Sequence, residues 1–196
     1  MKRISIISFA AILTTVVLGA AQLVSAQTAQ VTAKAQSVTG DRFTITTKTP
    51  KGAAIYAVNK PSATVLNAID KGLTDLFAVA RKNGYRTRLN YSDYTIYIAK
   101  ADRTKNAAGE YSPDFAVGAQ QYAGSVYDQG GYIYAAGMVL SNSPSAFVIA
   151  EHQSKFDRIS DVVRYEGEHI VLYHNDRRRY NATADHSKGG GHPILQ

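Results

Sequence analysis

The chain has 196 residues, of which 22 are Lys or Arg and 15 are Asp or Glu, so its formal charge at pH 7 is +7. It contains no cysteine, which excludes disulfides, thiolate catalysis and metal sites built on thiolates. The positive charges are scattered rather than clustered, and this distribution argues against a nucleic-acid-binding surface.

The N-terminus is typical of a secretory signal. Lys2 and Arg3 precede an apolar stretch over residues 4–18, and Val-Ser-Ala at 24–26 is a small-x-small cleavage site. We therefore expect residues 1–26 to be a signal peptide. The mature charge would be +7 minus the two lost cations, or +5. The apolar stretch is short for a membrane span, so we expect no membrane attachment after cleavage. The absence of cysteine favours a bacterial protein exported to the periplasm or secreted.

Residues 27–40 are rich in Gln, Ala, Thr and Ser and have no strong period, which predicts a flexible leader. Residues 41–196 are enough for one domain with a hydrophobic core. Residues 101–131 have few aliphatic side chains and are expected to be irregular, with a loop over 102–131 that could shape a binding site. Alternation and turn signals predict strands at 42–47, 53–58, 85–90, 94–99, 132–140 and 146–150.

Two amphipathic helices are expected. The first spans about 62–83, where apolar residues recur at spacings of three and four and Gly84 suits a C-cap. The second spans about 158–179, with Asp157 or Ser160 as its N-cap. The order of strands, helix, strands, helix predicts a single α+β domain with a mostly antiparallel sheet.

All five histidines fall in the last quarter of the chain, together with several carboxylates. No upstream segment has a comparable density of groups that bind metals or transfer protons, so the segment 151–196 is where we expect a site. Glu166, His169, Tyr173 and Asp176 follow one another at steps of three, four and three, which aligns them along one helix face. The five histidines are His152, His169, His174, His186 and His192.

The Glu166-x-x-His169 spacing places a carboxylate and an imidazole one turn apart, where both can bind one ion. The glycines at 189–191 would let the chain after the helix fold back toward them. Imidazole and carboxylate ligands suit zinc best, and also iron, manganese or nickel. The expected metal ligands are Glu166, His169, His174, Asp176, His186 and His192, with Asp185 as a further ligand or an outer partner.

Residues 165–169, Tyr-Glu-Gly-Glu-His, resemble the H-x-x-E-H helix of the inverted zincin metallopeptidases, with Tyr165 where the first zinc histidine stands. The resemblance covers five residues. It implies that Glu168 is the general base and that His169 is a zinc ligand. The clustered histidines and the N-terminal pattern predict an exported metal-binding protein. The resemblance implies that it is a zincin-like, metal-dependent hydrolase, with a small molecule, a peptide or a glycan as its ligand. A carboxylate–imidazole pair could also perform acid–base catalysis without a metal.

The alternative is a noncatalytic binding module in which the histidines are only structural. Nine of the thirteen tyrosines lie between residues 85 and 134, and tyrosine offers a rigid apolar surface with a polar tip. A tyrosine-rich sheet and loop could therefore bind a partner or a glycan. The sequence is consistent with both hypotheses.

Overall fold

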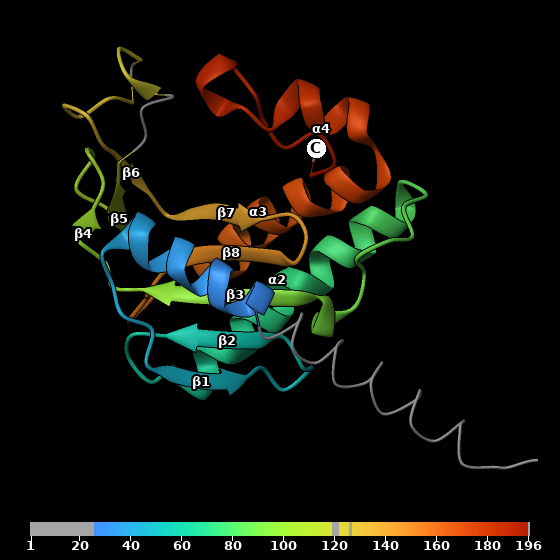
Figure 1. Cartoon of the computed structure of the whole chain (residues 1–196), viewed down its shortest axis with the longest axis horizontal. Coiled ribbons are helices and arrows are strands. Elements are labelled where there is room, and N and C mark those ends of the chain that lie inside the picture. The colour runs from blue at the N-terminus through green and yellow to red at the C-terminus, as the bar shows by residue number, and fades with distance from the viewer. Residues whose placement is uncertain (1–25, 119–121, 126, 196) are drawn as a thin grey trace, which may run out of the picture.

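A five-stranded sheet with helices on both faces forms the body of the protein (Figure 1). The computed structural model describes residues 26–118, 122–125 and 127–195. The main sheet has the order β1 (Ile45–Lys48), β2 (Ala54–Ala57), β3 (Tyr94–Ala99), β8 (Ser145–Ala150) and β7 (Gly137–Ser141). A smaller sheet contains β4 (Arg103–Lys105), β5 (Tyr111–Val117) and β6 (Ile133–Ala135).

The fold class is confirmed as α+β. Among the described strands, the pairs β1–β2, β4–β5, β5–β6 and β7–β8 are antiparallel. The centre of the main sheet is different, because β2, β3 and β8 run parallel to one another. Parallel neighbours need a crossover connection, and the helix between β2 and β3 supplies one.

That helix, α2 (Ala63–Lys82), confirms the predicted helix over about 62–83. The Ser62 side chain accepts a hydrogen bond from the Val65 amide at 3.3 Å and caps its first turn. Ile69, Leu73 and Leu76 are fully buried along one face of the helix, against the sheet and the second long helix. Burial of this stripe is the main stabilising contribution of the helix.

The second long helix, α3 (Asp157–Asn175), ends four residues before the predicted boundary at 179. Asp176 leaves the helical conformation, with φ −146° and ψ 80°, and its carboxylate accepts a hydrogen bond from the Arg179 amide at 2.9 Å. A carboxylate that caps a new turn competes with the continuing helix. The chain therefore restarts as α4 (Arg177–Thr183) in a new direction, followed by the short 3₁₀ helix η3 (His186–Lys188).

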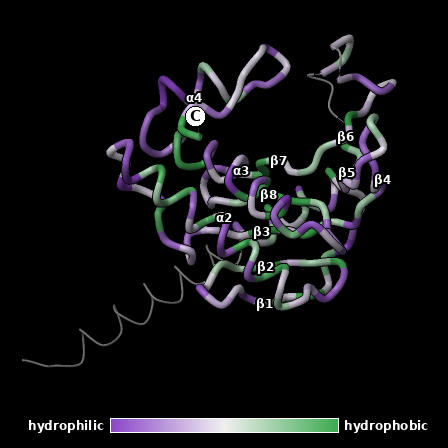
Figure 2. Tube along the Cα trace, turned by 180° about the vertical axis from the view of Figure 1, so that it is seen from behind, coloured by the Kyte–Doolittle hydropathy of each residue, from purple (hydrophilic) through white to green (hydrophobic). Residues whose placement is uncertain are grey.

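Helices α2 and α3 cover one face of the main sheet, as the view from behind shows (Figure 2). Two glycines allow the helices to approach closely. A Cβ at Gly72 would lie 2.5 Å from the Ser160 carbonyl oxygen, and a Cβ at Gly167 would lie 2.5 Å from a Leu76 methyl group. The close contact fixes α3 against α2 and the core.

The opposite face of the sheet carries a helix formed by residues 26–39, so the prediction of a flexible leader over 27–40 is wrong. Val31 and Ala35, one turn apart, are buried in the same cluster as Ala146 of β8. The Thr32 hydroxyl also lies 2.8 Å from the Tyr97 hydroxyl. Two buried apolar side chains are too few to produce a visible period in the sequence, and in the structure Val38 also packs against the same cluster.

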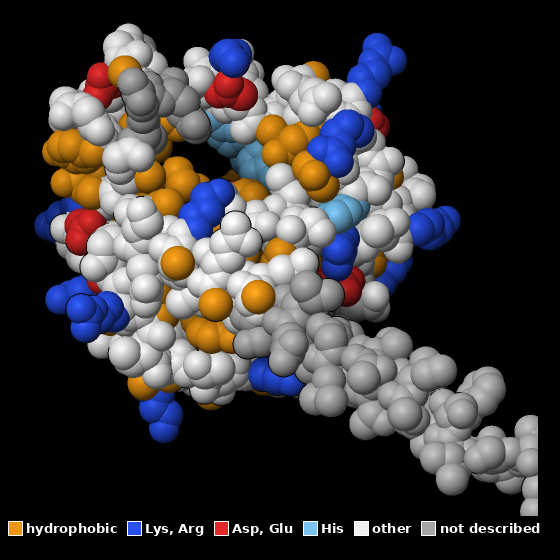
Figure 3. All heavy atoms as spheres, viewed as in Figure 1, with side chains coloured by type: hydrophobic (Ala, Val, Ile, Leu, Met, Phe, Trp, Pro, Cys, Tyr) orange, Lys and Arg blue, Asp and Glu red, His pale blue; other side chains and the backbone are white. Residues whose placement is uncertain are grey.

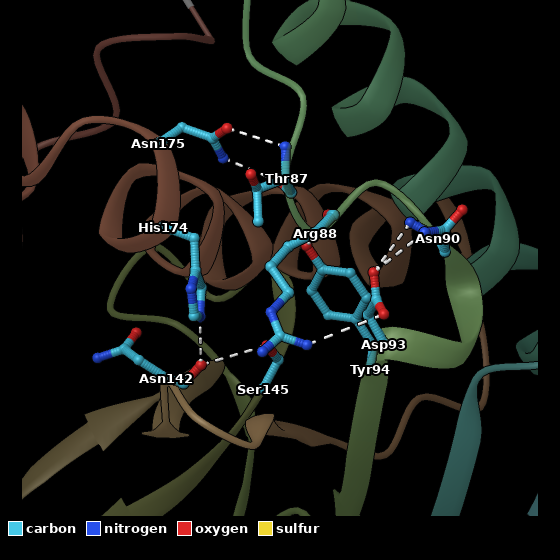
Figure 4. Close-up of polar contacts among 9 residues, drawn as sticks. All are labelled: Thr87, Arg88, Asn90, Asp93, Tyr94, Asn142, Ser145, His174 and Asn175. Carbon is cyan, nitrogen blue, oxygen red and sulfur yellow. Dashed lines mark hydrogen bonds and ion pairs between the residues drawn. The ribbon is translucent and has the colours of Figure 1, made fainter.

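Two further predictions need correction. Residues 85–90 form a loop instead of a strand, because Arg88 has a φ of +61° and the Asn175 side chain bonds the backbone of Arg86 and Thr87 (Figure 4). The segment 101–131, predicted to be irregular, contains β4 and β5. The predicted strand 132–140 is divided into β6 and β7.

The signal peptide was predicted for residues 1–26, and residues 1–25 lie outside the described part of the chain. Among the described residues, no helix has both the length and the apolar character that a membrane span requires.

Candidate metal centre

Three histidines that are far apart in the sequence meet beside the second half of α3. His169 comes from α3, His186 from η3, and His192 from the tail that follows. One ring nitrogen of each lies within 4.8 Å of the other two. The ring centroids are 5.1 Å apart for His169 and His186, 4.8 Å for His169 and His192, and 5.0 Å for His186 and His192. We call these three residues the histidine triad.

Each histidine of the triad has a buried ring nitrogen without a hydrogen-bond partner. These atoms are Nδ1 of His169, Nε2 of His186 and Nδ1 of His192. Leaving buried polar atoms unpaired is costly, and one cation could satisfy all three. Zinc–nitrogen bonds of about 2.0–2.1 Å in a tetrahedral site place the ligand nitrogens about 3.4 Å apart. The triad could therefore hold a metal ion after small rotations of the rings.

The triad is electrically suited to a cation, because its rings stay neutral. Burial lowers the pKa of His169 to about 3, and repulsion from His192 and His186 adds to the effect. Burial also lowers the pKa of His192 to about 4, with a smaller contribution from His186, and lowers the pKa of His186. Only a neutral imidazole has a free lone pair for a metal, so at neutral pH no proton has to be displaced.

The backbone turn after α4 brings His186 and His192 back to α3. Asp185 caps η3 by accepting a hydrogen bond from the Ser187 amide at 3.1 Å, and it forms an ion pair of 2.9 Å with Lys188. Gly190 lies so close to the preceding turn that a Cβ there would be 2.2 Å from the Thr183 carbonyl oxygen. The triad therefore depends on a turn that only glycine can occupy without displacement. The predicted role of the glycines at 189–191 agrees with this geometry.

Glu168, the predicted general base, anchors the tail. Its carboxylate is fully buried and accepts a hydrogen bond from the Ile194 amide at 3.1 Å, and the Ile194 side chain is buried in the core. Burial raises the pKa of Glu168 to about 7, while the Ile194 amide acts in the opposite direction. Two residues earlier in the tail, the His192 ring packs on Tyr165 with a centroid distance of 4.6 Å. These contacts position His192, and the role of Glu168 as a base stays a prediction.

Glu166 does not join the triad, although the sequence placed it one turn from His169. Steps of three residues on a helix leave an angular offset of about 60°. Here that offset directs Glu166 toward β7, where it accepts a hydrogen bond from the Val139 amide and packs against Gly137. Burial raises the pKa of Glu166 from its ordinary value of 4.5 to about 8, so the carboxyl is mostly protonated at neutral pH.

We expect the variant Glu166→Gln to remove a pH-dependent cost of folding. Above pH 4.5 the unfolded chain releases this proton while the folded chain keeps it, so the free energy of unfolding falls as the pH rises toward 8. The amide cannot ionise and retains an oxygen for Val139. Urea unfolding should show equal stability of the two proteins at pH 4.5 and a more stable variant at pH 8. An equal difference at both pH values would contradict the assignment.

His174 and Asp176 also lie outside the triad. Nε2 of His174 is 2.7 Å from the main-chain oxygen of Asn142, at the turn between β7 and β8 (Figure 4). Asp176 caps α4, and the Tyr85 hydroxyl donates to it at 3.4 Å. Of the six predicted ligands, the structure brings together His169, His186 and His192 alone among the described residues.

A cavity of about 540 Å³ adjoins the triad. The space-filling view shows the hollow, with histidine side chains on its wall (Figure 3). His169 and His186 line it, β7 forms another part of its wall, and tyrosines that include Tyr134 and Tyr180 face it. The sequence did not single out Tyr180 or Lys34 as lining residues, because both are ordinary helical positions whose proximity to the triad depends on the packing of the helices.

No family model, curated protein or solved structure matches this chain. The five-residue resemblance to inverted zincins is therefore not extended by any longer match. Tyr165, which stands where the motif of the inverted zincins has its first zinc histidine, packs against the His192 ring. The function of the chain must be inferred from the chemistry of the triad and of the cavity beside it.

Proposed function

We propose that this protein is an exported metal-binding protein that holds a divalent ion, zinc by preference, in the histidine triad. One observation carries the proposal: three histidines from separate segments place one ring nitrogen each within 4.8 Å of the other two. Each of them also has a buried ring nitrogen without a hydrogen-bond partner among the described residues. A set of structural histidines would be expected to bond carbonyls or carboxylates, as His174 does with Asn142.

The choice of zinc rests on the ligand set. Three imidazoles without sulfur match catalytic zinc sites, which use three protein ligands and keep a fourth position open. His169 and His186 also line the cavity, so a fourth position could be reached from it. A zinc ion in such a position acts as a Lewis acid and lowers the pKa of bound water, which is the chemistry of a metal-dependent hydrolase. Iron, manganese or nickel would also accept these ligands.

The noncatalytic alternative keeps a specific observation in its favour. Three tyrosines of the tyrosine-rich region, Tyr122, Tyr127 and Tyr134, line the same cavity as His169 and His186. A peptide, glycan or small molecule could then bind there without being cleaved. In this alternative the histidines are only structural, so His169→Ala should leave the binding of such a compound unchanged, whereas under the metal proposal the same variant loses the metal.

The test of the metal site is elemental analysis of the protein without a His tag, after dialysis against metal-free buffer. We expect close to one equivalent of metal in the wild type and almost none in His169→Ala, because removal of one of three ligands leaves an incomplete site. His174→Ala is the matched control and should keep its metal, since His174 lies outside the triad. Equal metal content in both variants, or none in the wild type loaded with zinc, would overturn the proposal.

Export is a separate part of the proposal and rests on the charged, apolar and small-residue pattern of residues 1–26. Expression of the full chain in a Gram-negative bacterium should yield a periplasmic or released protein whose N-terminal sequence starts near Gln27. A protein that keeps Lys2 and Arg3 and stays with the cytosolic fraction would contradict export without affecting the metal site.

A further inference from the structure

The cavity beside the triad has an unusual charge balance. Its wall includes the edge strand β7, aromatic rings and the two histidines, and none of its described lining residues is Asp or Glu. Lys34, from the helix of residues 26–39, is its only Lys or Arg among the described lining residues. The polar groups that face this space therefore give it a positive potential.

The positive charge of Lys34 is not neutralised by a carboxylate. Its ammonium group donates a hydrogen bond to the Leu140 carbonyl oxygen, and it takes part in no ion pair within the described residues. By contrast, Lys188, close to the triad in the sequence, is paired with Asp185 at 2.9 Å. A backbone carbonyl orients an ammonium group but leaves its full charge, so Lys34 can still attract an anion.

The ligand set of the triad adds to this potential. A divalent ion held by three neutral imidazoles keeps its whole charge of two, whereas carboxylate ligands would cancel part of it. Glu166, which lies behind Gly137 of β7, adds little negative charge at neutral pH because its carboxyl is mostly protonated. A loaded triad and Lys34 would therefore place two cationic centres on one cavity.

A hydrogen-bond donor faces the same cavity. The Tyr180 hydroxyl accepts a hydrogen bond from Nδ2 of Asn142 at 3.1 Å, so its own O–H remains free to donate. Tyr180 is also held from the side, by an edge contact with Tyr173 at 5.2 Å. A fixed hydroxyl donor suits an oxyanion, because a hydrogen bond to a charged acceptor is stronger than one to a neutral acceptor.

We propose that the cavity binds a small molecule with an anionic oxygen group, a carboxylate or a phosphate, between the triad metal, Lys34 and Tyr180. This inference rests on the proposed metal site. The anionic oxygen takes the open position of the metal, and Lys34 and Tyr180 hold the remainder of the group. An anion is favoured over a neutral ligand because each of the three contacts is stronger with negative charge.

The test uses the full mature protein loaded with cobalt(II), whose visible absorption reports the ligands of the metal. Inorganic phosphate, acetate and neutral acetamide are titrated separately. We expect phosphate or acetate to shift the spectrum with saturation, and acetamide to leave it unchanged. Comparison of the first two arms identifies which anionic group the cavity prefers. Lys34→Gln should raise the Kd of the preferred anion roughly tenfold, as expected for loss of a hydrogen bond to a charged group.

Lys188→Gln is the matched control, since Lys188 lies outside the lining of the cavity and is paired with Asp185. It should leave the Kd unchanged. Tyr180→Phe should raise the Kd without altering the cobalt content. If cobalt binds but neither anion shifts the spectrum, or if Lys34→Gln and Lys188→Gln behave alike, the inference is overturned while the metal site stands. If cobalt does not bind at all, the proposed metal site is overturned, and with it the anion site that rests on it.

Discussion

Zinc should raise the melting temperature of the metal-free protein by about 5–11 °C when its free concentration is near one hundred times the Kd. A ligand at that concentration that binds only the folded state contributes about 2.7 kcal/mol. Each kcal/mol shifts the Tm of a domain of this size by about 2–4 °C. The effect is expected to be cooperative, because the ion would join α3 to the C-terminal tail, which the Glu168–Ile194 hydrogen bond already holds against the same helix.

Calorimetry with chelator and with zinc would measure this shift, and His169→Ala should abolish it. Hydrogen exchange adds spatial information. Without metal, amides of residues 184–195 should exchange markedly faster than in the zinc-bound protein, while amides of β3 and β8 in the centre of the sheet should keep their protection. An equal Tm shift in His169→Ala would show that zinc binds elsewhere on the chain.

The variant Gly190→Ala should weaken metal binding roughly 10- to 100-fold without removing a ligand, the range seen when a group that orients metal ligands is lost. The added methyl group would lie 2.2 Å from the Thr183 carbonyl oxygen and 2.7 Å from that of Asp185. Both contacts are with backbone, so the turn itself must move, and it carries His186 and His192 on either side.

Gly191→Ala is the control for this experiment, because a Cβ at Gly191 would meet no atom within 4 Å. Zinc titration with a competing chelator gives the Kd of each protein, and urea unfolding of the metal-free forms gives their stability. We expect similar metal-free stability for all three proteins, since Gly190 lies outside the main core. Unchanged zinc affinity in Gly190→Ala would mean that the turn does not set the ligand positions.

Much of the fold was predictable because local patterns determine it. The helix α2 was recognisable from its apolar period, and the strands β1 and β2 from alternation and turn signals. The helix of residues 26–39 was not, since only Val31 and Ala35 of its residues are buried. The end of α3 at Asp176 depended on a single capping carboxylate, which a helical wheel treats as one more residue on a face.

The sequence likewise predicted one part of the candidate site and missed another. The density of imidazoles after residue 151 identified the correct segment and three of the six proposed ligands, His169, His186 and His192. The helical phase of Glu166 with His169 was misleading. A spacing of three residues leaves an offset of about 60°, and the position of the sheet decided which side chain turned inward.

Composition and local periodicity were enough to determine that this chain lacks thiolate ligands, forms an α+β domain and gathers its imidazoles at one end. Composition and local periodicity are properties of the sequence itself, and they do not depend on how the elements pack. Which imidazoles meet, and beside which cavity, was decided by the turn at Asp176, the close approach at Gly190 and the docking of Lys34 from the opposite end of the chain. These contacts join residues that are distant in sequence, so their geometry exists only once the core has packed.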